Sequence, residues 1–213
     1  MSRRIPVLLA ALGVLTGAAH ATENEHELAL DAGLVTMNEE AMRVFAPHSV
    51  MPLVGVRAGY ALDDRFSLVA GLHTGQRGLQ ITDRADSTEL FRTAYRASTL
   101  TAALKVDEDV VDGFAPYVIA GVVGHLGLVR LDDDPTRRDH PGQLRRSALS
   151  VGATAAAGAQ FRFGTVDLKV RPTLSFELGW QGVLNHRYDG GGDDMLPLGY
   201  SGVSFKGSAG VLF

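Results

Sequence analysis

Alternation of apolar and polar residues with a period of two is the feature that most constrains the fold of this chain. From Val166 to Gln181, every even position is apolar and every odd position is charged, polar or glycine. A helix would spread those charges around its circumference, whereas a strand places them all on one face. The pattern predicts a strand with one apolar and one polar face, and it recurs over 149–161 and 203–213.

Weaker versions of the same alternation bring the number of expected strands to eight. The expected segments are Glu27 to Thr36, Leu53 to Leu62, Phe66 to Gly75, Thr93 to Val106, Phe114 to Leu131, Leu149 to Phe161, Val166 to Gln181 and Val203 to Phe213. Their connections alternate between long (37–52, 76–92, 132–146 and 182–199) and short (63–65, 107–113 and 162–164). This rhythm predicts an all-β fold: an eight-stranded antiparallel up-and-down transmembrane β-barrel with short periplasmic turns and long extracellular loops.

Residues 1–21 have the layout of a cleaved signal peptide. Arg3 and Arg4 precede a short apolar core, and Ala19-His20-Ala21 forms a small-x-small cleavage site. We therefore expect two parts, a signal peptide over 1–21 and a barrel domain over 22–213. Removal of the two arginines changes the net charge from −4 to −6, which is too acidic for a typical nucleic-acid-binding protein.

Composition narrows the classes of protein further. The chain has no Cys, so disulfides, thiolate chemistry and cysteine metal sites are excluded. Its 25 Gly include Gly55, Gly71 and Gly158 on the polar face, where a narrow eight-stranded barrel needs small residues. No later segment is apolar for long enough to form a transmembrane helix.

Aromatic residues are expected to form two girdles where the barrel meets the membrane interfaces. The short-turn ends of the strands hold Tyr60, Phe66, Phe114, Phe161 and Phe213, and the long-loop ends hold Tyr95, Phe176, Trp180 and Tyr200. The alternative is that they are core aromatics of a soluble β-sandwich.

Charged residues on the polar face are expected to line the lumen. They are Asp31, Arg57, Lys105, Asp167, Lys169, Arg171, Glu177 and Lys206. A buried charge without a partner is costly, so we expect a network of salt bridges that fills the narrow interior. A structural plug is the leading interpretation, and a narrow ion pathway is the alternative.

Together these features resemble the small outer-membrane β-barrel superfamily that includes the membrane domain of OmpA and the OmpX-like proteins. The resemblance rests on the signal peptide, the eight alternating segments and the ending Gly210-Val211-Leu212-Phe213. It implies location in the outer membrane of a Gram-negative-type envelope, and it implies that Phe213 is a signal read by the barrel assembly machinery. No motif selects a subfamily, and no cofactor is implied.

Lipid A deacylases share this architecture and carry a His-x-Ser pair near the outer end of the barrel. Here the residues two positions after His73, His125 and His186 are glycine, glycine and tyrosine. No catalytic residue is therefore assigned, although a rearranged triad stays open. His73 and His125 are expected to face the lumen as polar filler.

The expected long loops carry two kinds of charged cluster. Carboxylates gather at 132–134 and 189–194, but no twelve-residue calcium-loop spacing is present, so no metal site is assigned. Arginines in or beside these loops are expected to contact the phosphates of lipopolysaccharide. They are Arg137, Arg138, Arg145, Arg146 and Arg187.

The leading hypothesis is a monomeric outer-membrane barrel with a structural or surface-interaction role, no enzymatic activity and no nucleic-acid partner. Three alternatives stay open: a narrow channel or carrier for a small solute, a membrane-embedded lipid A hydrolase, and a secreted lipocalin-like binder. In the last of these the apolar face would point inward around a ligand.

Overall fold

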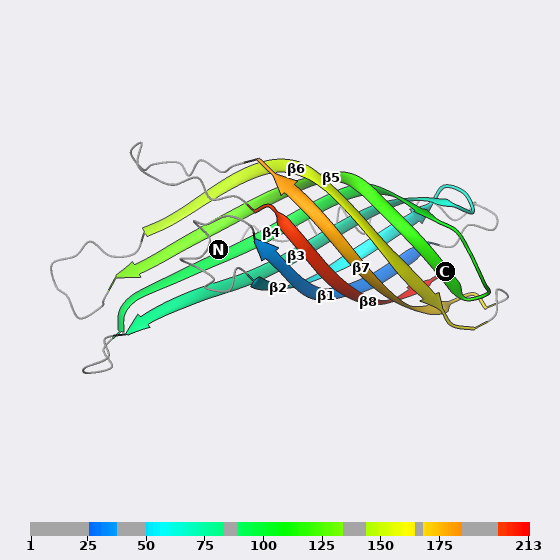
Figure 1. Ribbon diagram of the computed structural model, residues 1–213, viewed down its shortest axis with the longest axis horizontal. Helices are drawn as coiled ribbons and strands as arrows, with labels where there is room; N and C mark the ends of the chain where they lie inside the picture. The colour runs from blue at the N-terminus through cyan, green and yellow to red at the C-terminus, as the bar shows by residue number, and fades with distance from the viewer. Residues whose placement is uncertain (1–25, 38–49, 83–88, 134–143, 165–167, 185–199) are drawn as a thin grey trace, which may run out of the picture.

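The computed structural model describes residues 26–37, 50–82, 89–133, 144–164, 168–184 and 200–213. Eight strands make up this part of the chain: β1 (Glu27–Met37), β2 (Val50–Ala61), β3 (Phe66–Thr82), β4 (Glu89–Asp107), β5 (Phe114–Asp133), β6 (Leu144–Arg162), β7 (Arg171–Val183) and β8 (Gly202–Leu212). Each strand pairs antiparallel with the next, and β8 pairs with β1 to close the barrel (Figure 1). The prediction of a closed eight-stranded antiparallel barrel is confirmed.

Alternate residues of each strand face opposite sides of the barrel wall, as the period of two requires. The outward positions hold large apolar side chains that remain exposed, and each strand contributes some of them. One example from each strand, in order, is Leu30, Val54, Leu72, Leu100, Val122, Leu149, Leu178 and Phe205. The inward positions hold charged, hydroxyl and small residues, together with an apolar cluster described below.

Two of the short connections turn at glycines with positive φ. Gly113 has φ of 77° in the β4–β5 turn, and Gly164 has φ of 93° after β6. An L-residue with a side chain rarely adopts this conformation, so glycine suits both positions.

The strand β7 begins later than the sequence pattern indicates. Leu168, Lys169 and Val170 lie outside the strand and are exposed, and β7 starts at Arg171. Arg171 pairs with Leu212, the last residue of β8, so β8 offers no partner before Arg171. The alternating pattern therefore extends N-terminal to Arg171, into residues that have no pairing partner on β8.

The four central strands are longer than the others. The strands β3 to β6 have 17 to 20 residues, whereas β1, β2, β7 and β8 have 11 to 13. The strand β2 pairs with β3 only as far as Gly75, and β7 pairs with β6 only from Gly152. Beyond these residues, β3 to β6 continue as a four-stranded sheet that extends past the closed barrel (Figure 1). We call this part, opposite the short turns, the protruding sheet.

No helix in the described ranges is long and apolar enough to cross a membrane.

Candidate functional site in the barrel lumen

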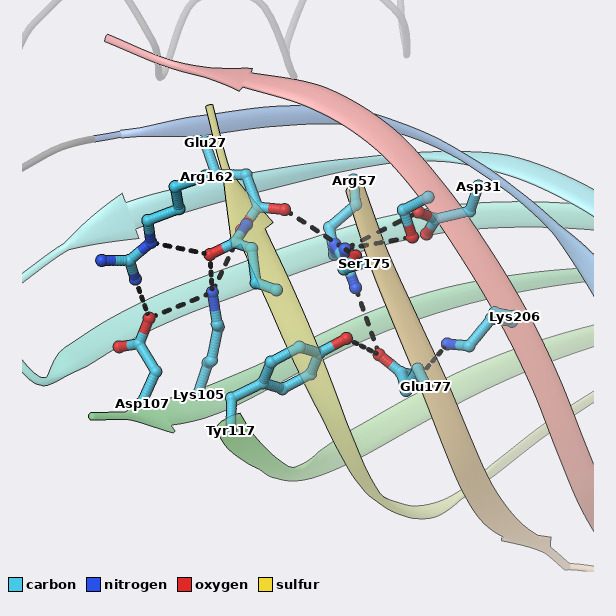
Figure 2. A network of polar contacts seen from close by, with 12 residues as sticks. Glu27, Asp31, Arg57, Lys105, Asp107, Tyr117, Arg162, Ser175, Glu177 and Lys206 are labelled. Carbon is cyan, nitrogen blue, oxygen red and sulfur yellow. Dashed lines mark hydrogen bonds and ion pairs between the residues drawn. The ribbon is translucent and has the colours of Figure 1, made fainter. Parts of the chain in front are cut away.

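Arg57 lies at the centre of an ion-pair network inside the barrel (Figure 2). Its guanidinium donates hydrogen bonds to Glu177 Oε2 at 3.1 Å and to Glu27 Oε1 at 3.2 Å, and Asp31 Oδ1 lies 3.9 Å away. It also donates to the hydroxyls of Ser175 and Ser208, each at 3.1 Å. Arg57 is 5% exposed, so it needs these partners to offset the loss of hydration. One side chain from β2 thereby links β1, β7 and β8.

Lys105 extends the network toward the short-turn end. Its Nζ lies 3.3 Å from Glu27 Oε2 and 3.4 Å from Asp107 Oδ2, and it donates to Gln160 Oε1 at 3.2 Å. Asp107 in turn accepts a hydrogen bond from Arg162 at 2.5 Å. Figure 2 shows Lys105 between the carboxylates of Glu27 and Asp107, with Arg162 next to Asp107. These contacts connect β1, β4 and β6 across the lumen.

Glu177 connects Arg57 to a second set of partners. Lys206 forms an ion pair with its Oε1, and the hydroxyl of Tyr117 donates to its Oε2 at 3.5 Å. The Tyr117 ring packs against Gly158. A Cβ atom added at Gly158 would lie only 2.6 Å from the ring. The absence of a side chain at Gly158 therefore makes room for this ring.

His73 and Asp31 form a buried pair on the side of Arg57 that faces away from the short turns. The Nε2 atom of His73 lies 2.7 Å from Asp31 Oδ2. The His73 ring lies between Gly55 and Gly71, where added Cβ atoms would collide with it or press against it. Among the described residues, no Ser or Thr hydroxyl forms a hydrogen bond to His73. The pair therefore lacks the nucleophile that a hydrolytic triad needs, while His186 lies outside the described residues.

An apolar and aromatic layer occupies the lumen at the opposite end from the short turns. His125 Nε2 is 2.9 Å from the Tyr95 hydroxyl, and the His125 and Tyr200 rings stack with centroids 4.1 Å apart. The layer is completed by the buried residues Val35, Met37, Met51, Leu53, Ala97, Val123, Val129, Ala148 and Val183. The lumen thus contains two layers in series, one ion-paired and one apolar.

Tyr200 and Tyr95 correct the girdle prediction. Both are buried, with 3% and 0% of their surface exposed, because they point into the barrel and stack in the aromatic layer. Tyr95 shares the inward parity of Thr93 and Ala97, and Tyr200 lies just before β8. The other predicted girdle residues are partly or largely exposed. They are Tyr60, Phe66, Phe114, Phe161, Phe176, Trp180 and Phe213.

Most predicted lumen charges lie inside the barrel. They are Asp31, Arg57, Lys105, Arg171, Glu177 and Lys206. Lys169 is a correction, because it lies in the exposed bend before β7 and contributes nothing to the lumen. Asp167 lies outside the described residues, as do the loop arginines Arg137, Arg138 and Arg187.

Sequence reasoning missed four members of the network that bear a carboxylate, guanidinium or amide, and it also missed the hydroxyl partners Ser175, Ser208 and Tyr117. Glu27 has the same parity as Asp31 and is detectable from that pattern, whereas the sequence pattern places Asp107 and Arg162 in the short connections. Gln160 carries no charge, so a search for charged residues passes over it. Inward parity also marks Val35, Met37 and other members of the apolar layer, so that layer was readable as well.

The remaining space in the lumen is small and divided. A cavity of about 40 Å³ lies between the two layers and is lined by Arg57, His73, Glu177 and Tyr200 among others, room for only a few water molecules. A wider mouth of about 220 Å³ at the short-turn end is lined by residues including Asp63, Asp107 and Arg162. In the described ranges, no three His, Cys, Asp or Glu residues are arranged to hold a metal ion.

Comparison with known proteins finds similarity in fold alone. No family model and no curated protein matches the sequence. The chain is similar to the N-terminal β-barrel domain of Pseudomonas aeruginosa OprF (14% identity, 90% of this chain and 98% of that one, TM-score 0.49). It is also similar to Ail of Yersinia pestis, solved with the heparin analogue sucrose octasulfate (11%, 90% and 100%, 0.49), and to Neisserial surface protein A (14%, 88% and 95%, 0.46). The chain resembles these small eight-stranded barrels.

Proposed function

We propose that this chain is an integral outer-membrane β-barrel with a closed lumen and a non-enzymatic, surface-interaction role. One observation carries the proposal: the polarity of the molecule is inverted relative to a soluble protein. Leu30, Leu149 and Leu178 are 67%, 78% and 61% exposed on the outside, whereas Arg57 and Glu177 are 5% and 3% exposed inside. A wall that is apolar on the outside all the way round suits lipid as its solvent.

The same inversion argues against a secreted lipocalin-like binder. Such a barrel would place its apolar face inward around a ligand and its charges in water. Here the inward face between the two ends is occupied by ion pairs around Arg57, and the cavity above them holds about 40 Å³. That space is far too small for a ligand the size of a typical lipocalin cargo.

The two lumen layers support a closed barrel in preference to a narrow channel. A solute that enters from the short-turn mouth meets the Arg57–Glu177–Lys206 layer first, and then the layer that contains Tyr200 and His125. Passage would require both layers to open. If the barrel is closed in this way, the role of its polar interior is to stabilise the fold.

The protruding sheet supports the surface-interaction part of the proposal. In the described part of the chain, Gln76–Thr82 of β3 and Leu144–Ser150 of β6 have a partner strand on one side only. An unpaired strand edge presents backbone donors and acceptors to another chain. The sheet lies at the end opposite the short turns, which in an outer-membrane barrel is the extracellular end.

Export and assembly complete the proposal. Residues 1–21, outside the described residues, would direct secretion and be removed. Phe213 would be read by the assembly machinery: its backbone pairs with His26 at 2.9 and 3.0 Å, and its side chain is 47% exposed at the short-turn end. Lipopolysaccharide would be the lipid partner in the outer leaflet.

Cell fractionation combined with gel migration tests the membrane assignment. The proposal expects the protein in the outer-membrane fraction, extracted only by detergent, with faster migration in unboiled than in boiled samples. Recovery in a soluble periplasmic or secreted fraction without detergent would overturn it.

A further inference from the structure

The short connections of the barrel differ in the side chains that they expose. The β2–β3 turn, Leu62 to Arg65, exposes one leucine and three charged residues. The β4–β5 turn and the β6–β7 connection instead expose large apolar side chains, which we call the apolar turn patch. They are Val110, Val111, Phe163, Leu168 and Val170, each between 49% and 63% exposed. Clustered apolar side chains on a surface usually mark contact with a membrane or with another protein.

Hydrogen bonds hold the two apolar connections next to each other. The backbone N–H of Arg162, at the end of β6, donates to the carbonyl of Gly113 in the β4–β5 turn at 2.8 Å. The Arg162 guanidinium also donates to both carboxylate oxygens of Asp109 in that turn, at 2.9 and 3.1 Å. The patch is therefore carried by one linked pair of connections.

The patch continues the outward apolar face of the wall. Phe163 has the same outward parity as Phe161 on β6, and Leu168 and Val170 have that of Leu174 on β7. Phe161 and Leu174 are opposite each other in the β6–β7 register and are 40% and 43% exposed. Phe163 lies two residues past Phe161, roughly 5 Å further along the barrel axis for strands inclined at about 40°. The headgroup layer on each side of a bilayer is roughly 5–7 Å thick, so a bilayer that covers Phe161 also reaches Phe163.

Charged side chains around the patch suit the headgroup layer better than the hydrocarbon core. Those described on the two connections are Glu108, Asp109, Asp112 and Lys169. Two of the carboxylates have basic partners, Arg162 at 2.9 Å and Arg65 at 3.7 Å. The third carboxylate and the lysine are exposed, where the ammonium and phosphate groups of phospholipids can interact with them. The apolar members then lie at the boundary between headgroups and acyl chains.

We propose that the apolar turn patch inserts into the inner leaflet and draws the β4–β7 side of the barrel into the phospholipid, while the β2–β3 turn stays in water. The inference rests on the proposed function, because the patch extends the lipid-facing wall. Continuity with that wall favours phospholipid over a periplasmic protein as the occupant. Insertion on one side tilts the barrel, and it thereby sets the angle at which the protruding sheet leaves the outer leaflet.

Spin labels on the full chain, reconstituted into vesicles of phosphatidylethanolamine and phosphatidylglycerol, test the insertion. Val111→Cys and Asp64→Cys place one label at the tip of each of two short turns in a chain without Cys. We expect the ratio of nickel-chelate to oxygen collisions to be at least about threefold lower at 111 than at 64. Equal ratios at 111 and 64 would overturn the proposal. Leu178→Cys on the wall reports the membrane assignment separately, since that assignment fails only if the label at 178 is open to the chelate.

Weakening the patch tests whether it holds the barrel in this position. Val110→Ser/Phe163→Ser, introduced beside Val111→Cys, should raise chelate access at 111 at least about twofold, because less apolar surface remains to insert. Leu62→Ser is the matched control, since Leu62 is an exposed leucine of the β2–β3 turn, and it should leave access at 111 unchanged. An unchanged value in the double variant, or an equal rise with Leu62→Ser, would refute the anchoring role. Heat-modifiable migration of every variant checks that the barrel is folded.

Discussion

Arg57 on β2 and Glu177 on β7 meet inside the barrel at 3.1 Å, although 120 residues separate them in the sequence. Neither strand pairs with the other in the sheet, so this contact spans the lumen. It makes the interior a structural element that ties together strands far apart along the chain.

Loss of Arg57 should strongly destabilise the barrel. Arg57→Ala leaves Glu27, Asp31 and Glu177 buried with fewer compensating positive charges, and breaking a buried network in this way costs about 3–5 kcal/mol. Urea unfolding in lipid vesicles measures the free energy of unfolding. Arg65→Ala is the control, because its ion pair with Glu108 is largely exposed and should contribute under about 1 kcal/mol. Equal effects of the two substitutions would refute the central role of Arg57.

Gly55 should not tolerate even a methyl group. Gly55→Ala places a Cβ against the His73 ring and the backbone oxygen of Leu72, so the wall or the His73–Asp31 pair must shift. Overpacking of this kind costs about 1–3 kcal/mol, measured by the same urea titration. Gly124→Ala is the matched control, because a Cβ there meets only the Leu100 oxygen at 3.9 Å. A Gly55→Ala protein as stable as the Gly124→Ala protein would contradict the packing described around His73.

The two layers predict an electrically silent barrel. Wild-type protein in planar bilayers should show no steady conductance, and Tyr200→Ala alone should stay silent because the Arg57 layer remains closed. The Tyr200→Ala/Arg57→Ala double variant should conduct, once heat-modifiable migration shows that it has folded. Steady openings of the wild type, particularly openings lost in Arg171→Ala, would instead identify the lumen as a conduit.

Removal of Phe213 should reduce the amount of protein in the outer membrane. The expected reason is failed recognition by the assembly machinery, so the protein should accumulate in the periplasm or be degraded. Phe205→Ala is the control, since Phe205 is also an exposed phenylalanine (54%) but lies within β8, whereas Phe213 follows the last residue of that strand. Quantitative blotting of membrane fractions compares them, and normal levels without Phe213 would rule out the assembly-signal proposal.

Most of the barrel could be predicted from the sequence because every strand of its wall follows one rule: apolar side chains outward alternate with polar or small side chains inward. Alternation identified all eight strands, and parity placed Asp31, Arg57 and Glu177 on the inner face. Parity cannot say where a partner strand ends, so the pattern places Lys169 in a strand that begins only at Arg171. It also cannot show that β3 to β6 outgrow their neighbours, because that depends on the pairing of whole strands.

The candidate site was only partly predictable for a related reason. The ion-paired layer follows from charges on the inward face, but the contact of Lys105 with Gln160 depends on side-chain reach across the lumen. The sequence does not distinguish a girdle position from a lumen position for Tyr200, because an aromatic residue near a strand end suits a membrane interface and a lumen plug equally well. Its stacking on His125 depends on how the barrel closes.

The inverted polarity of the wall is the central claim, and a single spin label tests it most directly. The chain has no Cys, so Leu178→Cys provides one labelling site on the outward face of β7, and Asp64→Cys provides a control in an exposed turn. In lipid vesicles, the label at 178 should collide readily with oxygen and rarely with a water-soluble nickel chelate, and the label at 64 should show the reverse. Equal access of the nickel chelate to both labels would contradict a lipid-facing wall.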